Sequence, residues 1–180
     1  AMHPAPILHR LILCVFSALS CAQATPSGPF GLDLPADAVS DHYSVTKSIS
    51  AGKTEDYATF EGPGCIKRIW ITLGRPVGSG RSVTPDAKPA RAFQNRKIIL
   101  RIYFDGAKTP NVEAPLGDFF GIMHGVDFYP VNTPFISVKE HNGYECFFEM
   151  PFAKSARIEI ANAPDSINSF YLQVAWHRYP

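Results

Sequence analysis

The stretch Phe-Tyr-Leu-Gln-Val-Ala-Trp-His, residues 170–177, decides the fold class. Apolar side chains fall on every second position: Phe170, Leu172, Val174 and Trp176 alternate with Tyr171, Gln173, Ala175 and His177. Successive side chains of a β-strand point to opposite faces, so this period buries one face and leaves the other outside. The stretch therefore predicts a half-buried strand of an antiparallel sheet.

The same two-residue period recurs along the chain. It is present at residues 67–73, 97–104 and 156–160, and a further apolar strand is expected at 144–150. Turn-forming sequences separate these stretches, at 62–64, 105–106, 142–143 and 162–165. We therefore expect an all-β protein, an antiparallel β-sandwich of jelly-roll type with about eight strands.

Composition supports this class. The 180 residues are 46% hydrophobic and 12% aromatic, only 18% are charged, and they include 16 prolines and 13 glycines. Such a chain can bury one core, and its many turn formers argue against a helix bundle. The formal net charge of +1 creates no field that would attract nucleic acid or an anionic membrane, so neither is expected as a partner.

The N-terminal segment has the pattern of an export signal. Residues 11–22 carry no charge, His9 and Arg10 precede them, and Ala22-Gln23-Ala24 follows. The apolar run is shorter than the ~20 residues of a membrane span, so no span is expected. We expect a signal peptide at 1–24, a linker at 25–41 and the jelly-roll domain at 42–180, in a secreted or periplasmic protein. An N-terminal core helix and a lipid anchor on Cys21 are the alternatives.

Two cysteines, Cys65 and Cys146, remain after the signal, each inside an apolar strand pattern. We expect two buried thiols, with a disulfide as the alternative. The chain has no CxxC motif, no Cys/His cluster, no GxGxxG and no Walker loop. Neither a metal nor a cofactor is therefore expected.

Three motifs in a fixed order resemble a known family. They are EGPGCIKRIWIT at 61–72, the run from LRIYFDG at 100–106 through PNVEAPLGDFFG at 110–121 to HG at 124–125, and CFFEMPFAKSARIEI at 146–160. Together they resemble the N-terminal part of the domain-of-unknown-function 2961 proteins, grouped as glycoside hydrolase family 172, over about residues 50–178.

The resemblance implies a protein with two tandem jelly rolls that forms homo-oligomers and acts on fructofuranosyl or arabinofuranosyl linkages. The family's paired catalytic glutamates lie in the second jelly roll, in motifs such as Gly-Glu-Gly-Asp that this sequence lacks. Residues 54–57, Thr-Glu-Asp-Tyr, resemble part of such a motif but fall where the family has an ordinary first-domain strand. We expect this chain to be the first jelly roll, with no catalytic residue of its own.

The role implied is that of the N-terminal domain of a secreted glycoside hydrolase that acts on a furanose-containing glycan. The domain would supply scaffold, homo-oligomer interface and part of the sugar pocket. The alternative is a stand-alone, non-catalytic carbohydrate-binding or assembly module.

Retaining hydrolysis needs two carboxyl groups about 5–5.5 Å apart. The acidic candidates are Glu113, Asp118, Glu140, Glu145 and Glu149. Glu113 and Asp118 are five positions apart around Pro115 and Gly117 and could share one rim. The commoner use of such residues is a turn cap or a salt bridge with an arginine, so we expect no catalytic pair.

The candidate sugar-binding residues are Asp118, His124 and Tyr129. Asp118 and His124 are polar groups around a glycine-containing loop that follows an apolar strand, and Tyr129 precedes Pro130. A metal site at Asp118, His124 and Asp127 is disfavoured by irregular spacing. Trp70 and Trp176 lie within strand patterns and are expected in the core.

Two further segments carry expectations. The basic stretch 74–97 is expected to be a solvated connection, with an anion- or partner-binding loop as the alternative. The doublets Phe119-Phe120 and Phe147-Phe148 are expected on strands, which would point one phenylalanine of each toward a neighbour.

Overall fold

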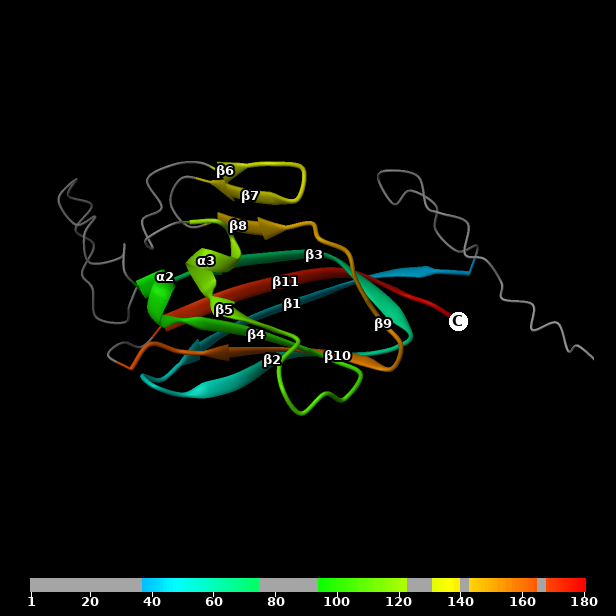
Figure 1. Ribbon diagram of the computed structural model, residues 1–180, viewed down its shortest axis with the longest axis horizontal. Coiled ribbons are helices and arrows are strands. Elements are labelled where there is room, and N and C mark those ends of the chain that lie inside the picture. The colour runs from blue at the N-terminus through cyan, green and yellow to red at the C-terminus, as the bar shows by residue number, and fades with distance from the viewer. Residues whose placement is uncertain (1–36, 75–93, 123–130, 140–142, 165–167) are drawn as a thin grey trace, which may run out of the picture. The chain divides into compact units, whose positions relative to one another are not determined.

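Two antiparallel sheets face each other in the computed structural model, which describes residues 37–74, 94–122, 131–139, 143–164 and 168–180 (Figure 1). The large sheet has the order β1 (Val39–Ile49), β11 (Asn168–Arg178), β3 (Gly64–Leu73), β8 (Gly143–Cys146), β7 (Ile136–Lys139) and β6 (Val131–Asn132), and β9 (Met150–Phe152) also pairs with β3. The small sheet has the order β2 (Thr54–Glu61), β10 (Ser155–Ala161), β4 (Ile99–Phe104) and β5 (Val112–Pro115). The predicted all-β sandwich is confirmed, and its jelly-roll type stays a prediction.

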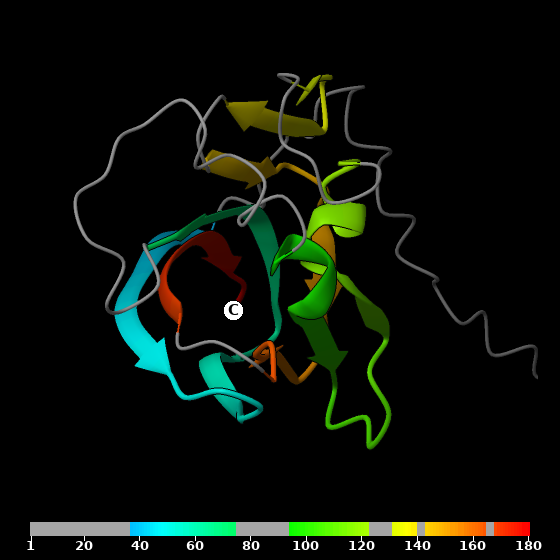
Figure 2. The same ribbon diagram turned by 90° about the vertical axis from the view of Figure 1, so that its left-hand side faces the viewer.

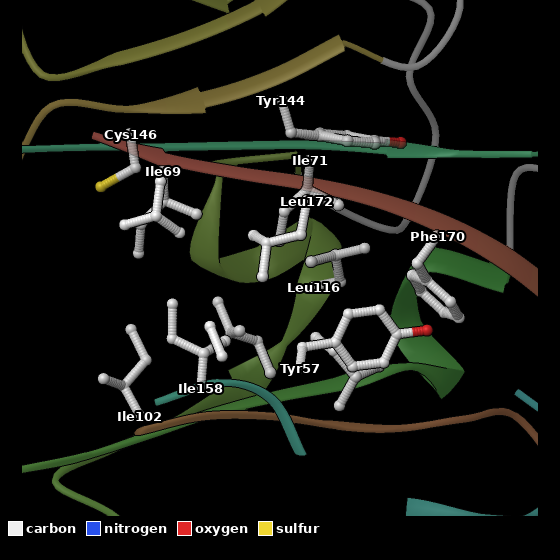
Figure 3. Close-up of a cluster of buried hydrophobic side chains, with 14 of the residues drawn as sticks. Tyr57, Ile69, Ile71, Ile102, Leu116, Tyr144, Cys146, Ile158, Phe170 and Leu172 are labelled. Atoms are coloured by element: carbon white, nitrogen blue, oxygen red, sulfur yellow. The ribbon is translucent and has the colours of Figure 1, made fainter. Parts of the chain in front are cut away.

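The core lies between the sheets, as the two-residue period predicts. The alternating residues of β11, Phe170, Leu172, Val174 and Trp176, are all buried. Figure 3 shows Ile69 and Leu172 of the large sheet pointing toward Ile102 and Ile158 of the small sheet. Burying one such side chain contributes roughly 1.5–3 kcal/mol, so this layer supplies the main cohesion between the two sheets.

Strand β1 begins at Val39, three residues before the expected domain start at 42. It pairs with β11 over its whole length, from Val39 opposite Arg178 to Ile49 opposite Asn168. The expected signal peptide, 1–24, lies outside the described residues.

The expected strand at 144–150 is broken. Strand β8 ends at Cys146 opposite Ile69, and β9 resumes at Met150 opposite Ile66. Three residues, 147–149, thus face only two residues of β3, and the ladder cannot continue through that mismatch. Both phenylalanines of the doublet leave the strand and are exposed, Phe147 at 38% and Phe148 at 46%. The predicted opposite faces are therefore wrong for this doublet.

Residues 116–119 form a short helix, α3 (Leu116–Phe119), instead of the expected strand. The Phe120 N–H donates to the Leu116 and Gly117 carbonyls, and Gly121 takes a positive φ of 74° that ends the turn. Leu116 and Phe120 are four positions apart, so the helical turn directs both into the core, where both are fully buried. Phe119 packs edge-on against Phe120 with ring centroids 4.9 Å apart, so this doublet presents no phenylalanine to a neighbour.

The second helix, α2 (Gln94–Lys97), is equally short. Within the described ranges no helix has the length and apolar character that crossing a membrane requires. Figure 1 shows β8, β7 and β6 continuing the large sheet beyond β3, and Figure 2 shows the same arrangement turned by 90°.

Both cysteines carry free, buried thiols, which confirms the favoured expectation. Burial raises the pKa of Cys146, and burial is also the main cause of the raised pKa of Cys65. Both groups therefore stay protonated and act as small apolar side chains.

Replacing a buried residue of the small sheet tests the assignment of faces. Ile158 on β10 is fully buried, so Ile158→Ala removes apolar contacts and leaves a cavity. We expect the free energy of unfolding to fall by about 2–5 kcal/mol in urea denaturation followed by circular dichroism. Thr59→Ala, at an exposed position of the neighbouring strand β2, should change it by less than about 0.5 kcal/mol. Equal stability of Ile158→Ala and the unaltered protein would contradict this face assignment.

Candidate functional site

Of the three predicted sugar contacts, Asp118 is the one that lies within the described residues. It lies on α3, directly after the end of β5, and its side chain is 39% exposed. The Arg96 Nε atom of α2 lies 4.0 Å from the Asp118 Oδ1 atom. An exposed carboxylate with a nearby guanidinium can accept hydrogen bonds from hydroxyl groups, and the guanidinium adds donors beside it.

The position of Arg96 is fixed by its neighbour in the sequence. The Asn95 side-chain amide donates to the Tyr144 hydroxyl over 2.6 Å, and Asn95 is buried at 3% exposure. Tyr144 belongs to β8, so this bond ties α2 to the large sheet. Gly117 of α3 lies so close that a Cβ atom there would be 3.1 Å from the Asn95 Cβ. The two helices, and with them Asp118 and Arg96, are thereby held together.

The other two predicted contacts, His124 and Tyr129, lie outside the described residues, as do Glu140 and residues 75–93 of the basic stretch. In the sequence, Asp118 precedes His124 by six residues. The prediction that Asp118, His124 and Tyr129 contact one sugar therefore stays a prediction.

The remaining acidic candidates are each engaged by a basic side chain on a neighbouring element. Glu113 on β5 accepts from Arg101 over 2.8 Å, Glu145 on β8 accepts from Arg68 over 2.6 Å, and Glu149 binds Lys67. Glu113 belongs to the small sheet and Glu145 to the large one. The expected salt bridge with an arginine is confirmed for Glu113 and Glu145, whereas Glu149 pairs with a lysine.

The outer face of the small sheet holds a charged network that the sequence did not reveal. Glu159 of β10 accepts hydrogen bonds from Arg101 over 3.0 Å, from Arg157 over 3.0 Å and from the Tyr103 hydroxyl over 3.2 Å. Arg157 also binds the Asp56 carboxylate over 2.5 Å, and its guanidinium lies 3.9 Å above the centre of the Tyr103 ring. These residues bridge β2, β10 and β4.

The network also explains residues 54–57. Asp56 and Tyr57 belong to the regular strand β2, where Asp56 is held by Arg157 and Tyr57 is buried at 2% exposure. Burial, aided by the nearby Glu55 charge, raises the pKa of the Tyr57 phenol well above its usual range. The prediction of an ordinary strand here is confirmed.

Trp70 is on the outer face of the large sheet, which corrects the prediction that it lies in the core. It is half-buried and alternates with fully buried Ile69 and Ile71 on β3. The alternation of residues 69–71 already predicts the outer face for Trp70, because it places this residue on the face opposite the two isoleucines. Trp176 does lie in the core, with its ring 5.1 Å from that of Phe60.

A family model described as GH172 domain-like matches residues 41–172. The chain belongs to this family. The match runs from β1 into β11 and so includes both sheets and the helices α2 and α3. It confirms the relation indicated by the three sequence motifs. A search of curated proteins finds no match.

The GH172 domain-like fold places Asp118 beside a cation, which is a poor environment for a metal ion. Arg96 would compete with a metal for the carboxylate. In the part of the chain that the structure describes, no three metal-binding side chains gather in one place.

The charged network predicts how the GH172 domain-like sandwich responds to acid. Burial opposes the ionisation of Glu159, but hydrogen bonds from Arg101, Arg157 and Tyr103 outweigh it, so the pKa of Glu159 lies below its ordinary value of 4.5. A carboxyl whose pKa is lower in the folded chain stabilises the fold above its unfolded pKa. That stabilisation is lost as the pH falls from about 4.5 through the lower folded pKa.

We therefore expect Glu159→Gln to be less stable than the unaltered protein at neutral pH and to lose less stability on acidification. Urea denaturation at several pH values between about 6 and 3 measures this difference. Glu61→Gln, at the exposed end of β2, is the control and should keep the unaltered pH profile. An unchanged slope in Glu159→Gln would show that another carboxylate governs the acid response.

Proposed function

We propose that this chain is the N-terminal, non-catalytic domain of a secreted or periplasmic glycoside hydrolase that acts on fructofuranosyl or arabinofuranosyl linkages. The observation that carries the proposal is the GH172 domain-like match, which spans both sheets of the sandwich. The furanoside class comes from the resemblance of the three motifs, and the export route comes from the pattern of residues 1–24.

The first part of the proposed role is one wall of the sugar pocket. Asp118 supports it, because its carboxylate is exposed on α3 beside Arg96. Such a pair can accept and donate hydrogen bonds to neighbouring hydroxyls of one sugar ring. His124 and Tyr129 belong to the same proposed wall.

The second part is an interface between copies of the chain. Phe135, in the β6–β7 turn, is 53% exposed and stacks on Phe148 with ring centroids 5.1 Å apart and an interplanar angle of 3°. The Phe147 N–H donates to the Phe135 carbonyl over 2.7 Å, which fixes the two segments together. Phe135 and Phe148, here called the phenylalanine patch, form an exposed apolar surface of the kind that marks contacts between proteins. A second copy is the partner proposed here.

The alternative function is a stand-alone, non-catalytic carbohydrate-binding or assembly module. The ion pairs of Glu113, Glu145 and Glu149 agree with it as well as with the first proposal, because neither assigns catalysis to these residues. The two differ in whether a catalytic partner domain follows in the mature protein. The mass of the protein isolated from its natural source distinguishes them.

Binding and cleavage assays with furanosides test the proposed non-catalytic role. We expect the chain to bind fructo- or arabino-oligosaccharides in affinity electrophoresis and to leave aryl fructofuranosides and arabinofuranosides uncleaved. Asp118→Asn should weaken binding by about fivefold or more, because a charged acceptor is lost. Glu113→Gln, whose carboxylate is engaged by Arg101 on the sheet face, is the matched control. Cleavage by this chain would overturn the non-catalytic assignment, and absence of binding would overturn the glycan role.

Polar substitution of the phenylalanine patch tests the interface. We expect Phe135→Ser with Phe148→Ser to lower the molar mass measured by light scattering after size exclusion, because the apolar contact between copies is removed. Val39→Ser, at another exposed apolar position on β1, should leave the mass unchanged. The same mass for the double variant and the unaltered protein would contradict the interface.

A further inference from the structure

The outer face of the large sheet carries two outward aromatic side chains on neighbouring strands. Trp70 of β3 lies opposite Gln173 of β11 on one side and opposite Glu145 of β8 on the other. Tyr171 lies opposite Thr72, which is two residues beyond Trp70 on β3, so Tyr171 is the diagonal neighbour of Trp70 on the same face. Diagonal neighbours on antiparallel strands are about 7–8 Å apart, within reach of one ligand.

Both rings lie beside glycines. A Cβ atom on Gly143 would be 4.0 Å from the Trp70 Nε1 atom, and a Cβ atom on Gly74 would be 3.4 Å from the Tyr171 Cε2 atom. Each ring therefore reaches over a position that carries no side chain. Tyr171 is 40% exposed and Trp70 is half-buried, which leaves aromatic surface open on this face.

The polar groups around the rings are suited to hydroxyl groups. Three side-chain polar groups make no hydrogen bond to any residue that the structure describes. They are the Trp70 indole N–H, the Tyr171 hydroxyl and the side-chain amide of Gln173. Arg68 donates to Glu145 over 2.6 Å, and Lys139 lies 3.9 Å from the other Glu145 oxygen. Because Arg68 neutralises the Glu145 carboxylate, the face offers fixed donors and acceptors with little net charge.

The two aromatic rings and the nearly neutral polar groups around them favour one class of ligand. A polyanion would require several unpaired cations, and a protein interface of ordinary size would require a larger apolar centre. A neutral sugar ring has a C–H face that packs on the negative face of an aromatic ring, and hydroxyls on its edge that pair with amide, carboxylate and guanidinium groups. The outer face of the large sheet supplies both kinds of contact.

We propose that Trp70 and Tyr171 form a binding platform for a neutral oligosaccharide, with Gln173 and the Arg68–Glu145 pair as its polar partners. The inference rests on the proposed glycan role but concerns a second site. Asp118 lies on α3 after the small-sheet strand β5, whereas the platform lies on the face of the large sheet turned away from the core. The platform would hold a glycan chain that extends beyond the pocket.

The chain offers a direct optical test, because it contains only two tryptophans. Trp70 is partly open to solvent and Trp176 is buried at 7% exposure. Acrylamide should therefore quench the Trp70 emission and leave that of Trp176 largely protected. We expect fructo- or arabino-oligosaccharide to shield Trp70 from quenching in the unaltered full chain. In Trp70→Phe, the remaining emission should not respond to the sugar.

Affinity electrophoresis in gels that contain the same two kinds of sugar gives the second measurement of binding. Trp70→Ala and Tyr171→Ala should each weaken binding several-fold, and the double variant by about tenfold or more. Tyr171→Phe keeps the ring and should retain most of the binding. Val39→Ala, which removes an exposed apolar side chain at the start of β1, is the control, and circular dichroism checks that each variant is folded.

The outcomes separate the two proposals. Binding by the unaltered chain that is lost in the platform variants supports the platform. Binding that survives in Trp70→Ala and Tyr171→Ala, with no shielding of Trp70, overturns the platform and leaves the glycan role standing. Absence of any binding by the unaltered chain overturns both. A fall in molar mass of the platform variants without loss of sugar binding would assign the face to a protein contact and would also overturn the platform.

Discussion

Burial of alternate side chains between β3 and β11 on one side and β4 and β10 on the other is the constraint on which the structure depends. The inward residues, such as Ile69, Leu172, Ile102 and Ile158, hold the two sheets together. Since the period of a strand is two, fixing the inward set also fixes which side chains must point outward. The charged network of the small sheet and the aromatic platform of the large sheet are both consequences of that one choice.

Much of this could be predicted from the sequence because the signal is local. The alternation at 97–104, 156–160 and 170–177 identifies strands and their buried faces without knowledge of any partner strand. Trp70 shows that membership of a strand pattern is not enough: its place within a strand led to the prediction of the core, whereas its position between Ile69 and Ile71 requires the outer face. Position within the period was the better guide.

The features that escaped prediction depend on contacts between distant segments. Arg101 and Glu159 are 58 residues apart, and Arg68 and Glu145 are 77 apart, so only the strand register brings each pair together. The break at 147–149 arises because these three residues face two residues of β3, a mismatch that no local pattern reveals. The turn of α3 depends on the hydrogen bonds that close it between Pro115 and Gly121, although apolar residues there would equally suit a strand.

The two outer faces lead to different chemical expectations. On the small sheet, Glu159 has three donors and Arg157 is shared between two carboxylates and the Tyr103 ring, so the polar groups satisfy one another. A ligand there would have to break existing hydrogen bonds, and each broken bond to a charged group costs about 1.5–3 kcal/mol. On the large sheet, Trp70, Tyr171 and Gln173 keep polar atoms that no described group engages. A sugar can bind there without displacing a protein contact, so the face with fewer ion pairs is the one better suited to recognition.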